Sequence, residues 1–285
     1  MKLFSFKNLP KIPKLKLAVV GHVEWVTFLA VDRCPQGGLI THGDIYQEQP
    51  AGGGAVTAVQ IAQLTNSSVH LFTSLGKDSE GEKSYLRLQK LGLKTSVAWR
   101  DKPTRRGISM LDSKGERAIT VIGERLEPNA KDQLPWEELK GYDGVFVSAA
   151  DTEALTLCRK ATVMVATPRI GLINLKRSGF KLDALIGSAL DPDEKLQLLN
   201  SQTSANLTIA TEGALGGKAW PGGQFEACKL KSKLIDSYGC GDSFAGGVTT
   251  GLASGWSTEQ AISLGAHCGA NCATHLGPYP KLNSD

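Results

Sequence analysis

With 285 residues, of which 41% are hydrophobic and 21% charged, the chain can bury one large core and is expected to form one main domain. The formal net charge of +4 is modest, and much of it lies in a basic N-terminal extension, residues 1–16, which contains Lys2, Lys7, Lys11, Lys14 and Lys16. This pattern does not indicate a nucleic-acid-binding protein. Residues 1–16 also lack a continuous apolar run, so we expect no signal peptide, no membrane contact and a cytoplasmic location.

Apolar runs and helical patterns alternate along the rest of the chain. The apolar runs predict strands at 17–21, 69–75, 144–148, 163–166 and 207–210. The helical patterns predict helices at 55–64, 80–90, 152–159 and 193–199, and a capping-box match, Ser257 to Gln260, predicts another that extends to about residue 274. This repeated order favours a mainly parallel sheet covered by helices.

Two stretches depart from this order. Residues 95–100 and 107–122 resemble strands, and the second contains a hairpin that turns at 112–115. Residues 40–49 could add another strand. Together these segments predict a small β-lid, with strands drawn from about 40–50 and 95–122. The alternative is that they extend a sheet edge or form a dimer contact, and both roles can coexist.

Six cysteines are scattered through the chain (Cys34, Cys158, Cys228, Cys240, Cys268 and Cys272). Because no secretory signal is expected, we predict reduced thiols. Cys268 and Cys272 fall four residues apart on the last predicted helix, near two histidines, so a metal site is conceivable. No second cluster completes a tetrahedral set, and we favour small buried thiols that pack in a helix rich in Ala and Gly.

The stretch Asp236–Gly247 combines a glycine-flanked turn with the expected start of a helix. Gly239 and Gly241 allow backbone N–H groups to converge on an anion, and the first turn of the helix adds free donors and the positive end of its dipole. Cys240 would contribute through its backbone N–H. Asp242 is placed to accept a proton from an attacking hydroxyl. The pattern predicts phosphoryl transfer, and the alternative is a glycine-rich turn that only leads into a close-packed helix.

These residues resemble the C-terminal signature of the ribokinase/PfkB family of carbohydrate kinases, which reads Asp-Thr-x-Gly-Ala-Gly-Asp-Ser-Phe. Ser237 and Cys240 replace the usual Thr and Ala. The resemblance covers nearly the whole chain after Lys16. It implies that residues 17–285 form a ribokinase-like three-layer α/β/α sandwich with a mainly parallel central sheet and a small β-lid. In the family this lid closes over the acceptor and excludes water, which limits wasteful ATP hydrolysis.

A second glycine cluster resembles the family's N-terminal diglycine signature and implies an acceptor-binding role for Gly52 and Gly53. Many sugar kinases carry Asn where Thr57 stands, and Asn and Asp shortly after the first strand, where Glu24 and Val26 stand. Val26 cannot accept a hydrogen bond from a sugar hydroxyl, so the acceptor is expected to differ from plain ribose.

His22, Glu24 and Thr57 are expected to contact a different polyol, although His22 and Glu24 could instead form a surface loop. The expected lid also carries three arginines (Arg105, Arg106 and Arg117). Of these, Arg105 is assigned to substrate binding, because a guanidinium there could bind a phosphate or carboxylate on the acceptor. Exposed arginines are common, and Arg117 matches a recurrent lid sequence of the family, so a structural role is the alternative.

On the nucleotide side, Thr211, Gly213 and Gly216 resemble the family segment Thr-x-Gly-x-x-Gly, which borders the ATP phosphates. Their place after a predicted strand is where ligands bind in this architecture, and a plain turn is the alternative. By resemblance to the family's adenine-side helix, the other expected nucleotide-binding residues are Ala270, Asn271 and Gly277.

The family's Asn-x-x-Glu element, which orders the water shell of Mg²⁺, has no clear match. Asp191 and Glu194 could substitute for it, and an acidic first turn of a helix explains the same run without metal. Mg²⁺ is expected in any case because it accompanies ATP. By analogy, Asp236 would bind a monovalent cation such as K⁺.

The sequence therefore predicts an ATP-dependent kinase that phosphorylates a hydroxyl of a sugar, sugar phosphate or sugar acid. Its expected partners are ATP and this small acceptor, and it would be a monomer or a homodimer through the lid. One alternative is a nucleoside kinase, for which Trp25 and Phe28 are the nearest candidates to clamp a base. The other is a non-catalytic family member that serves as a binding or scaffold protein.

Overall fold

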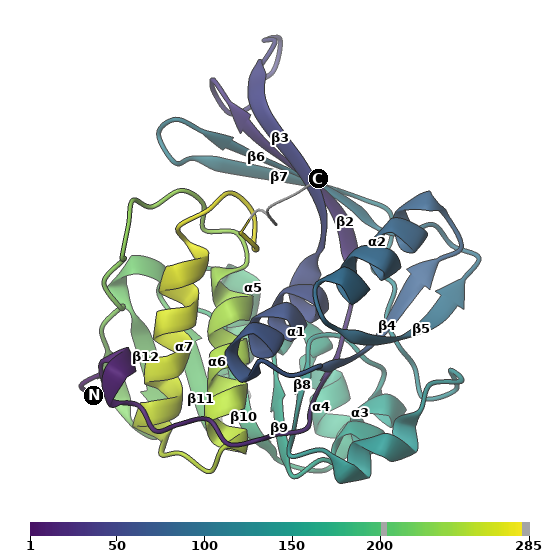
Figure 1. The fold of residues 1–285 in the computed structure, drawn as a ribbon, viewed down its shortest axis with the longest axis vertical. Coiled ribbons are helices and arrows are strands. Elements are labelled where there is room, and N and C mark those ends of the chain that lie inside the picture. Colours follow the sequence, from purple (N-terminus) through teal and green to yellow (C-terminus); the bar gives the residue numbers. More distant parts are fainter. Residues whose placement is uncertain (201–203, 281–285) are drawn as a thin grey trace.

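Short apolar runs pair as the strands of one central sheet in the computed structural model, which describes residues 1–200 and 204–280 (Figure 1). Among these residues the sheet has nine strands in the order β13-β12-β11-β10-β9-β8-β1-β4-β5. Every pairing from β11 to β5 is parallel, and β12 and β13 form an antiparallel edge. The strands are β1 (Leu17–Val20), β4 (His70–Gly76), β5 (Lys94–Arg100), β8 (Gly144–Val147), β9 (Val163–Ala166), β10 (Leu182–Ser188), β11 (Ala205–Thr211), β12 (Gly217–Trp220) and β13 (Gly223–Phe225).

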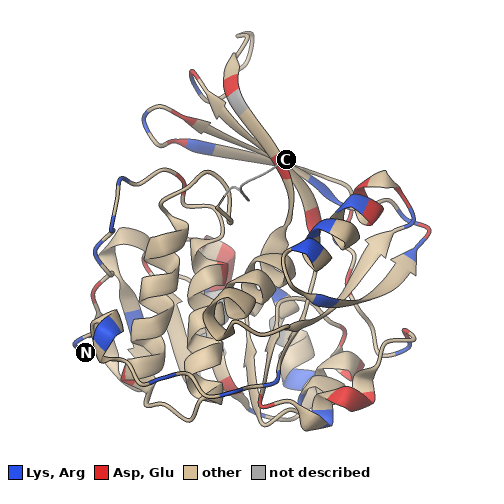
Figure 2. Cartoon of the chain, viewed as in Figure 1, with Lys and Arg blue, Asp and Glu red and all other residues tan. Residues whose placement is uncertain are grey.

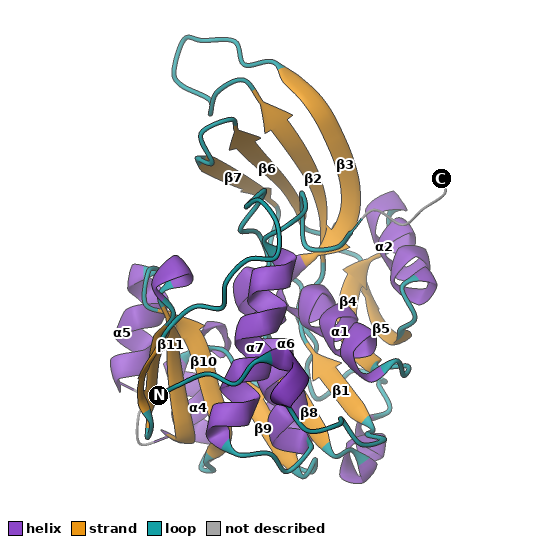
Figure 3. Cartoon of the chain, turned by 60° about the vertical axis from the view of Figure 1, so that its left-hand side comes forward, coloured by secondary structure: helices purple, strands orange, loops and turns teal. Residues whose placement is uncertain are grey.

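Helices cover both faces of this sheet (Figures 1 and 3). One face carries α1 (Gly52–Thr65), α2 (Ser79–Lys90), α6 (Cys240–Ala253) and α7 (Thr258–Cys272), and the other carries α3 (Thr152–Cys158), α4 (Leu172–Ser178) and α5 (Pro192–Asn200). Successive strand side chains alternate between the two faces. Val19 therefore packs in one apolar cluster with α1 and α6, whereas Ala18 and Val20 pack in the other with α3. The expected three-layer α/β/α sandwich is confirmed.

A second sheet projects from one end of this body (Figure 3). It has the order β3-β2-β6-β7, formed by β2 (Glu24–Val31), β3 (Gly43–Ala51), β6 (Arg106–Asp112) and β7 (Arg117–Ile122). The hairpin between β6 and β7 turns over Asp112, whose Oδ1 accepts the N–H groups of Lys114 and Glu116 at 2.9 Å each. Because β3 runs directly into α1, this sheet is joined to the body beside the first glycine cluster.

One expected lid strand lies elsewhere. Residues 95–100 belong to β5, which pairs in parallel with β4 at the edge of the central sheet and is covered by α2. The prediction that they contribute to the lid was wrong, because their strand pattern carries no information about which sheet they join. The place beside β3 is taken by β2, a strand that the sequence pattern did not predict.

The basic N-terminal segment packs against the body rather than extending from it. It passes along α7 before it enters β1 (Figure 1). The N–H of Phe4 donates to Ser263 Oγ at 2.9 Å, and the N–H of Lys16 donates to Asp143 Oδ2 at 2.7 Å. Basic and acidic positions are interspersed on α2 and around α3 in Figure 2. Within the described residues, no helix combines the length and apolarity that a membrane crossing requires.

Candidate active site

The glycine-flanked turn leads into α6 as the sequence predicts. Gly239 has a φ of 77° and is the residue before the helix, and its C=O accepts the first helical N–H, from Ser243, at 2.8 Å. A Cβ on Gly239 would lie 2.9 Å from Pro278 Cβ, so this position needs glycine for both conformation and space. A Cβ on Gly241 would instead meet no atom within 4 Å. The free N–H groups of the first turn therefore have open space in front of them for an anion.

Asp242 lies at the junction of α6 and α1. Its side chain is 16% exposed, and a Cβ added to Gly53 would come within 3.2 Å of its Oδ1 atom. The hydroxyl of Thr57, a fully buried residue of α1, donates to the main-chain oxygen of Asp242 at 3.1 Å. Thr57, which the sequence assigned to the acceptor, therefore positions the backbone of Asp242 and is not free to contact a ligand.

Arg169 connects the two acidic residues of the site, and sequence reasoning missed it. It follows β9 in a short 3₁₀ turn (Pro168–Ile170). Its Nε donates to Glu194 Oε1 at 2.7 Å, and its Nη1 lies 3.4 Å from Asp242 Oδ1. The charge of Asp242, followed by that of Glu194, raises the pKa of Arg169 above its already high range. An arginine at the carboxyl end of a predicted buried strand was the signal that could have revealed it.

The carboxyl ends of the parallel strands surround a cavity of about 40 Å³ beside this arginine. Its polar lining includes Thr167, Arg169, Ser188, Glu194, Thr211 and Asp242, together with Gly241. The hydroxyl of Thr211 donates to Gly187 O at 3.3 Å. The loop that follows is closed by a bond from Glu212 N to Gly216 O at 2.7 Å, and Gly216 has a φ of 92°. The expected phosphate-side loop and the glycine-flanked turn before α6 therefore share one cavity through Thr211.

The two acids expected near Mg²⁺ have different surroundings. Asp191 Oδ1 accepts the N–H groups of Asp193 and Glu194, at 2.9 and 3.2 Å, and so caps the start of α5. Glu194 is buried, and its Oε2 accepts Ser188 N–H at 2.8 Å while its other oxygen meets Arg169. Mg²⁺ keeps several waters and takes phosphate oxygens as ligands, so Glu194 fits a role in ordering that water shell. Asp191 fits helix capping instead.

Asp236 holds the glycine-flanked turn to the segment that follows α7. It is 1% exposed; its Oδ1 accepts Tyr238 N–H and its Oδ2 accepts Gly277 N–H, both at 3.0 Å. Arg117 of β7 reaches the same carboxylate, with Nη1 3.7 Å from Oδ1. These contacts use part of the acceptor capacity of the Asp236 carboxylate, and its expected role as a K⁺ ligand stays a prediction. The contact with Arg117 links the second sheet to the turn.

The acceptor-side residues predicted from the sequence come together where β1, β2 and α1 meet. Glu24 Oε1 lies 3.4 Å from His22 Nε2 and 3.4 Å from Arg105 Nε, and both His22 and Glu24 are buried. Burial raises the pKa of Glu24, but hydrogen bonding with His22 and the charge of Arg105 outweigh it and hold the pKa below its ordinary value. Gly52, with a φ of 85°, lets the backbone pass against His22, where a Cβ would lie 3.0 Å from the ring.

The three residues expected to bind the nucleotide near the last helix lie in two different places. Ala270 and Asn271 line a cavity of about 230 Å³ together with Lys229 and Lys231. Gly277 lies elsewhere: it is buried against the side-chain amides of Gln47 and Gln49 on β3, and it donates to Asp236. Gly277 therefore stabilises the turn at Asp236 and does not line the cavity beside Ala270.

The comparison with protein families agrees with this geometry. Residues 14–169 and 175–284 match the model described as pfkB family carbohydrate kinase. The chain belongs to this family.

Individual relatives share between 22% and 34% of their residues with this chain over the aligned regions. Ribokinase from Lactococcus lactis subsp. lactis is 26% identical over 295 residues, which cover 94% of this chain and 95% of that enzyme. Fructoselysine 6-kinase from Escherichia coli is 34% identical over 102 residues, and this chain spans only 39% of the length of that kinase. The crystal structure of ribokinase from Thermotoga maritima has a TM-score of 0.71 at 22% identity, over 93% of this chain and 94% of that chain. This last similarity supports the fold.

Proposed function

We propose that this pfkB protein is an ATP-dependent kinase that transfers a phosphoryl group to a hydroxyl of a small carbohydrate-like acceptor. The observation that carries the proposal is the placement of Asp242. Its carboxylate lies beside Gly53 on the acceptor side, within the same cavity as Gly241 and Thr211. A base, a set of free N–H donors and a space between them are the parts that phosphoryl transfer requires.

In this mechanism Asp242 accepts the proton of the acceptor hydroxyl as that oxygen attacks the phosphoryl group. The N–H groups of Gly239 and Gly241 donate to the phosphoryl oxygens, where negative charge is held during transfer. Cys240 N–H, which makes a long bond to Ser237 O at 3.4 Å, would add to them by sharing that bond. Arg169 keeps Asp242 in place and balances the charge of both acids. Mg²⁺ bound with ATP would neutralise phosphate charge, with Glu194 ordering its water shell.

The acceptor side favours a polar ligand. His22 Nδ1 and Ser148 Oγ are buried without a hydrogen-bond partner, and we propose that the hydroxyls of a bound acceptor supply one. Arg105 is already paired with Glu24, so it would bind an anionic group only by sharing that charge. We propose a sugar as the acceptor, with sugar phosphates and sugar acids as the next candidates.

The two aromatic residues that could have supported a nucleoside kinase are both packed against other side chains. Phe28 is fully buried and packs edge-on against Tyr238 at a centroid distance of 4.8 Å, and Trp25 is 8% exposed beneath Lys83. Neither ring is free to clamp a base. The scaffold alternative gives no reason for an acid, an arginine and an open glycine to meet in one cavity.

The second sheet supports a homodimer, which we propose as the assembly. It exposes Tyr46, Ile119, Val121 and Ile122, which are between 46% and 68% exposed. By pairing register and strand alternation, Ile119 and Val121 share one face of the sheet, and Tyr46 and Ile122 share the other. Apolar side chains exposed on a sheet face are typical of a surface that a second copy covers. Light scattering coupled to gel filtration would give the mass of the dimer, and Ile119→Asp with Val121→Asp should give a monomer.

The decisive experiment measures ADP release by the purified protein with Mg²⁺ and ATP across sugars, sugar phosphates, sugar acids, fructosamines and nucleosides. Calorimetric titration with an ATP analogue runs in parallel, so that failure to bind ATP is distinguished from a missing acceptor. We expect one acceptor class to be turned over, with a loss of at least about 10³-fold in Asp242→Asn. Equal turnover by wild type and Asp242→Asn would refute the assignment of the base.

A further inference from the structure

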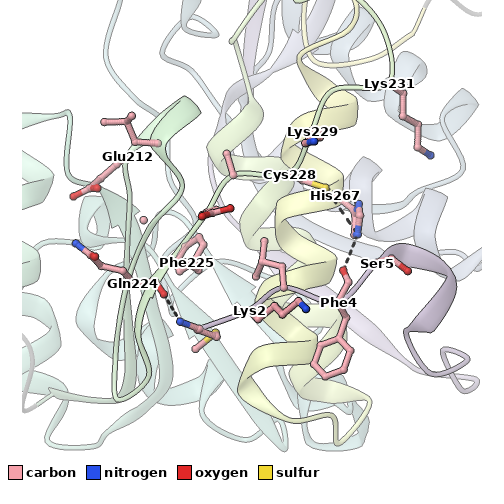
Figure 4. A pocket seen from close by; sticks show the side chains of 16 residues that line it. Lys2, Phe4, Ser5, Glu212, Gln224, Phe225, Cys228, Lys229, Lys231 and His267 are labelled. Carbon is pink, nitrogen blue, oxygen red and sulfur yellow. Dashed lines mark hydrogen bonds between the residues drawn. The ribbon is translucent and has the colours of Figure 1, made fainter.

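A large cavity lies away from Asp242, on the face where the N-terminal segment meets α7. It encloses about 1220 Å³ and is formed by residues 1–5, the end of the β13 region and α7 (Figure 4). Figure 4 shows Cys228 and His267 next to one another at its centre. Neither residue has a role in the kinase mechanism proposed above.

Cys228 and His267 form a thiol–imidazole pair, and the contacts of the ring indicate which nitrogen faces the thiol. His267 Nε2 lies 3.1 Å from Phe4 O, and a carbonyl oxygen can only accept, so Nε2 carries the proton. In the neutral ring Nδ1 is then an acceptor, and it lies 2.9 Å from Cys228 Sγ. The thiol therefore donates to an imidazole that is oriented by Phe4. Cys228 is thus the nucleophile, His267 the base beside it, and Phe4 O the group that orients the base. This arrangement is the one that activates catalytic cysteines.

Burial raises the pKa of the Cys228 thiol, although the charge of Lys231 opposes this effect. At neutral pH the thiol is consequently protonated at rest and needs a base to react. His267 supplies one within hydrogen-bond distance, so reactivity at this site should depend on the imidazole rather than on a free thiolate.

Charge around the pair favours anions. Lys2, Lys229 and Lys231 line the cavity, whereas Glu212 and Glu226 are the acids in its lining. Figure 4 places Lys229 next to Cys228 and Glu212 at the opposite side of the cavity. Lys231 also lies over the Phe6 ring, with Nζ 5.8 Å from its centroid, which keeps this cation near the entrance formed by the N-terminal segment. Three lysines against two acids in the lining give the cavity an excess of positive charge, which favours a negatively charged reagent.

We propose that Cys228 is a modification site for small anionic disulfides, with His267 as the base that activates it. In the reaction His267 Nδ1 takes the thiol proton, and Cys228 Sγ attacks one sulfur of the disulfide. The disulfide S–S bond breaks as the mixed S–S bond forms, and the second half leaves as a thiolate that takes up a proton. The reagent is the oxidant, so the step needs no other electron acceptor. The inference does not depend on kinase activity.

The other half-exposed cysteines provide internal controls. Cys34 donates to Glu116 O at 3.3 Å, and Cys240 lies at the start of α6, 3.9 Å from Asp236 O. Neither has a histidine partner among the hydrogen bonds of the described residues. Cys158, Cys268 and Cys272 are buried.

The test treats the full chain with oxidised glutathione under native conditions and follows the product by intact mass and peptide mapping. We expect one glutathionyl group, on Cys228, formed about tenfold faster than adducts at Cys34 or Cys240, removed by a reducing agent and missing in Cys228→Ser. His267→Gln should slow the reaction by about 10²-fold, because a positioned base contributes 10²–10⁴. Equal rates at Cys34 and Cys228, or an unchanged rate in His267→Gln, would overturn the proposal.

A second measurement needs no variant and remains valid if His267→Gln does not fold. Wild-type protein is alkylated separately with anionic iodoacetate and neutral iodoacetamide at low salt, and peptide mapping gives the rate at each cysteine. The ratio of the iodoacetate rate to the iodoacetamide rate should be higher at Cys228 than at Cys34, and the difference should shrink at high salt. A ratio at Cys228 equal to or below that at Cys34 would contradict the role of the lysines.

Discussion

Arg169 Nη1 lies 3.4 Å from Asp242 Oδ1, although 73 residues separate the two in the chain. The same guanidinium donates to Glu194 at 2.7 Å, so one cation holds together the proposed base and the acid proposed to order the metal's water shell. The relative position of these two acids is thus set by a side chain rather than by the backbone alone.

Replacing Arg169 with Gln should lower kcat by about 10²-fold, which is the usual effect of losing a preorganised charged donor. Stability should fall by about 1–3 kcal/mol, because the arginine is 41% exposed but its partner Glu194 is buried and would lose a charged donor. Steady-state kinetics and urea denaturation measure the two effects. Arg169→Lys is the control, since it keeps the charge and should recover part of kcat. Wild-type kcat in Arg169→Gln would show that the bridge has no role in turnover.

Gly241→Ala tests the anion site without disturbing the fold. A Cβ there meets no atom within 4 Å, so the melting temperature should stay within about 2 °C of wild type. The methyl group would nevertheless stand in the space proposed for the phosphoryl group, so turnover should fall by about 10²-fold or more. Gly37→Ala, where a Cβ is equally free of contacts, is the matched control and should keep full activity. Normal kinetics in Gly241→Ala would place the phosphoryl group elsewhere.

Because Thr57 donates a hydrogen bond to Asp242, its replacement by Val should have a larger effect than its replacement by Ser. Thr57→Val keeps the shape of the side chain but removes the second hydrogen bond of Asp242 O, which as a carbonyl within α6 also accepts a helical N–H. This should cost about 1 kcal/mol of unfolding free energy and reduce kcat. Thr57→Ser keeps the hydroxyl and should retain most of kcat. Chemical denaturation and turnover assays compare the two. If Thr57→Val raised KM for the acceptor and left kcat and stability unchanged, the residue would be a ligand contact as the sequence predicted.

His70 should make stability depend on pH. It is buried in β4, between Tyr142 OH and Ser96 Oγ at 2.8 Å each, and burial lowers its pKa from 6.5 to about 4. Between these values the unfolded chain binds a proton that the folded protein does not, so stability is full above about pH 6.5 and falls as pH decreases toward 4. The loss attributable to this group is at most about 3 kcal/mol.

Urea denaturation of wild type and His70→Gln across this pH range isolates the contribution of His70, because all other titrating groups are common to both. The two curves of unfolding free energy should converge as pH falls. Parallel curves would mean that His70 takes up its proton equally in the folded and unfolded states.

The local patterns predicted most elements but not how strands are assigned to sheets. Lys94–Arg100 has a strand pattern and is a strand, yet its partner is β4 rather than the lid. Glu24–Val31 follows β1 after a break of only three residues, and its partners lie at Gly43–Ala51 and Arg106–Asp112. Pairing over such separations depends on tertiary packing, which a local window does not contain.

The site was predicted where function depends on backbone geometry and was incomplete where it depends on contacts between distant side chains. Gly239, Gly241 and Asp242 form a contiguous motif and could be read directly. Arg169 gains its role only through Glu194 and Asp242, which approach it in the folded chain. For the same reason Thr57 looked like a ligand contact, since only the packing of α1 on α6 shows that its hydroxyl is already bonded.

The second sheet is attached to the body at one end only, where β2 begins and β3 ends, so a small rotation at this junction moves its far end by a larger distance. Strand β2 begins at Glu24 and β3 ends at Ala51, beside the proposed acceptor groups, and the nine residues of β3 extend roughly 30 Å from that pivot. A rotation of roughly 10° at the pivot would displace the far end by about 5 Å while Glu24 hardly moves. Cys34, bonded to the turn of the β6–β7 hairpin, sits at that far end. A dye attached there would convert a small adjustment around the acceptor into a large and easily recorded displacement.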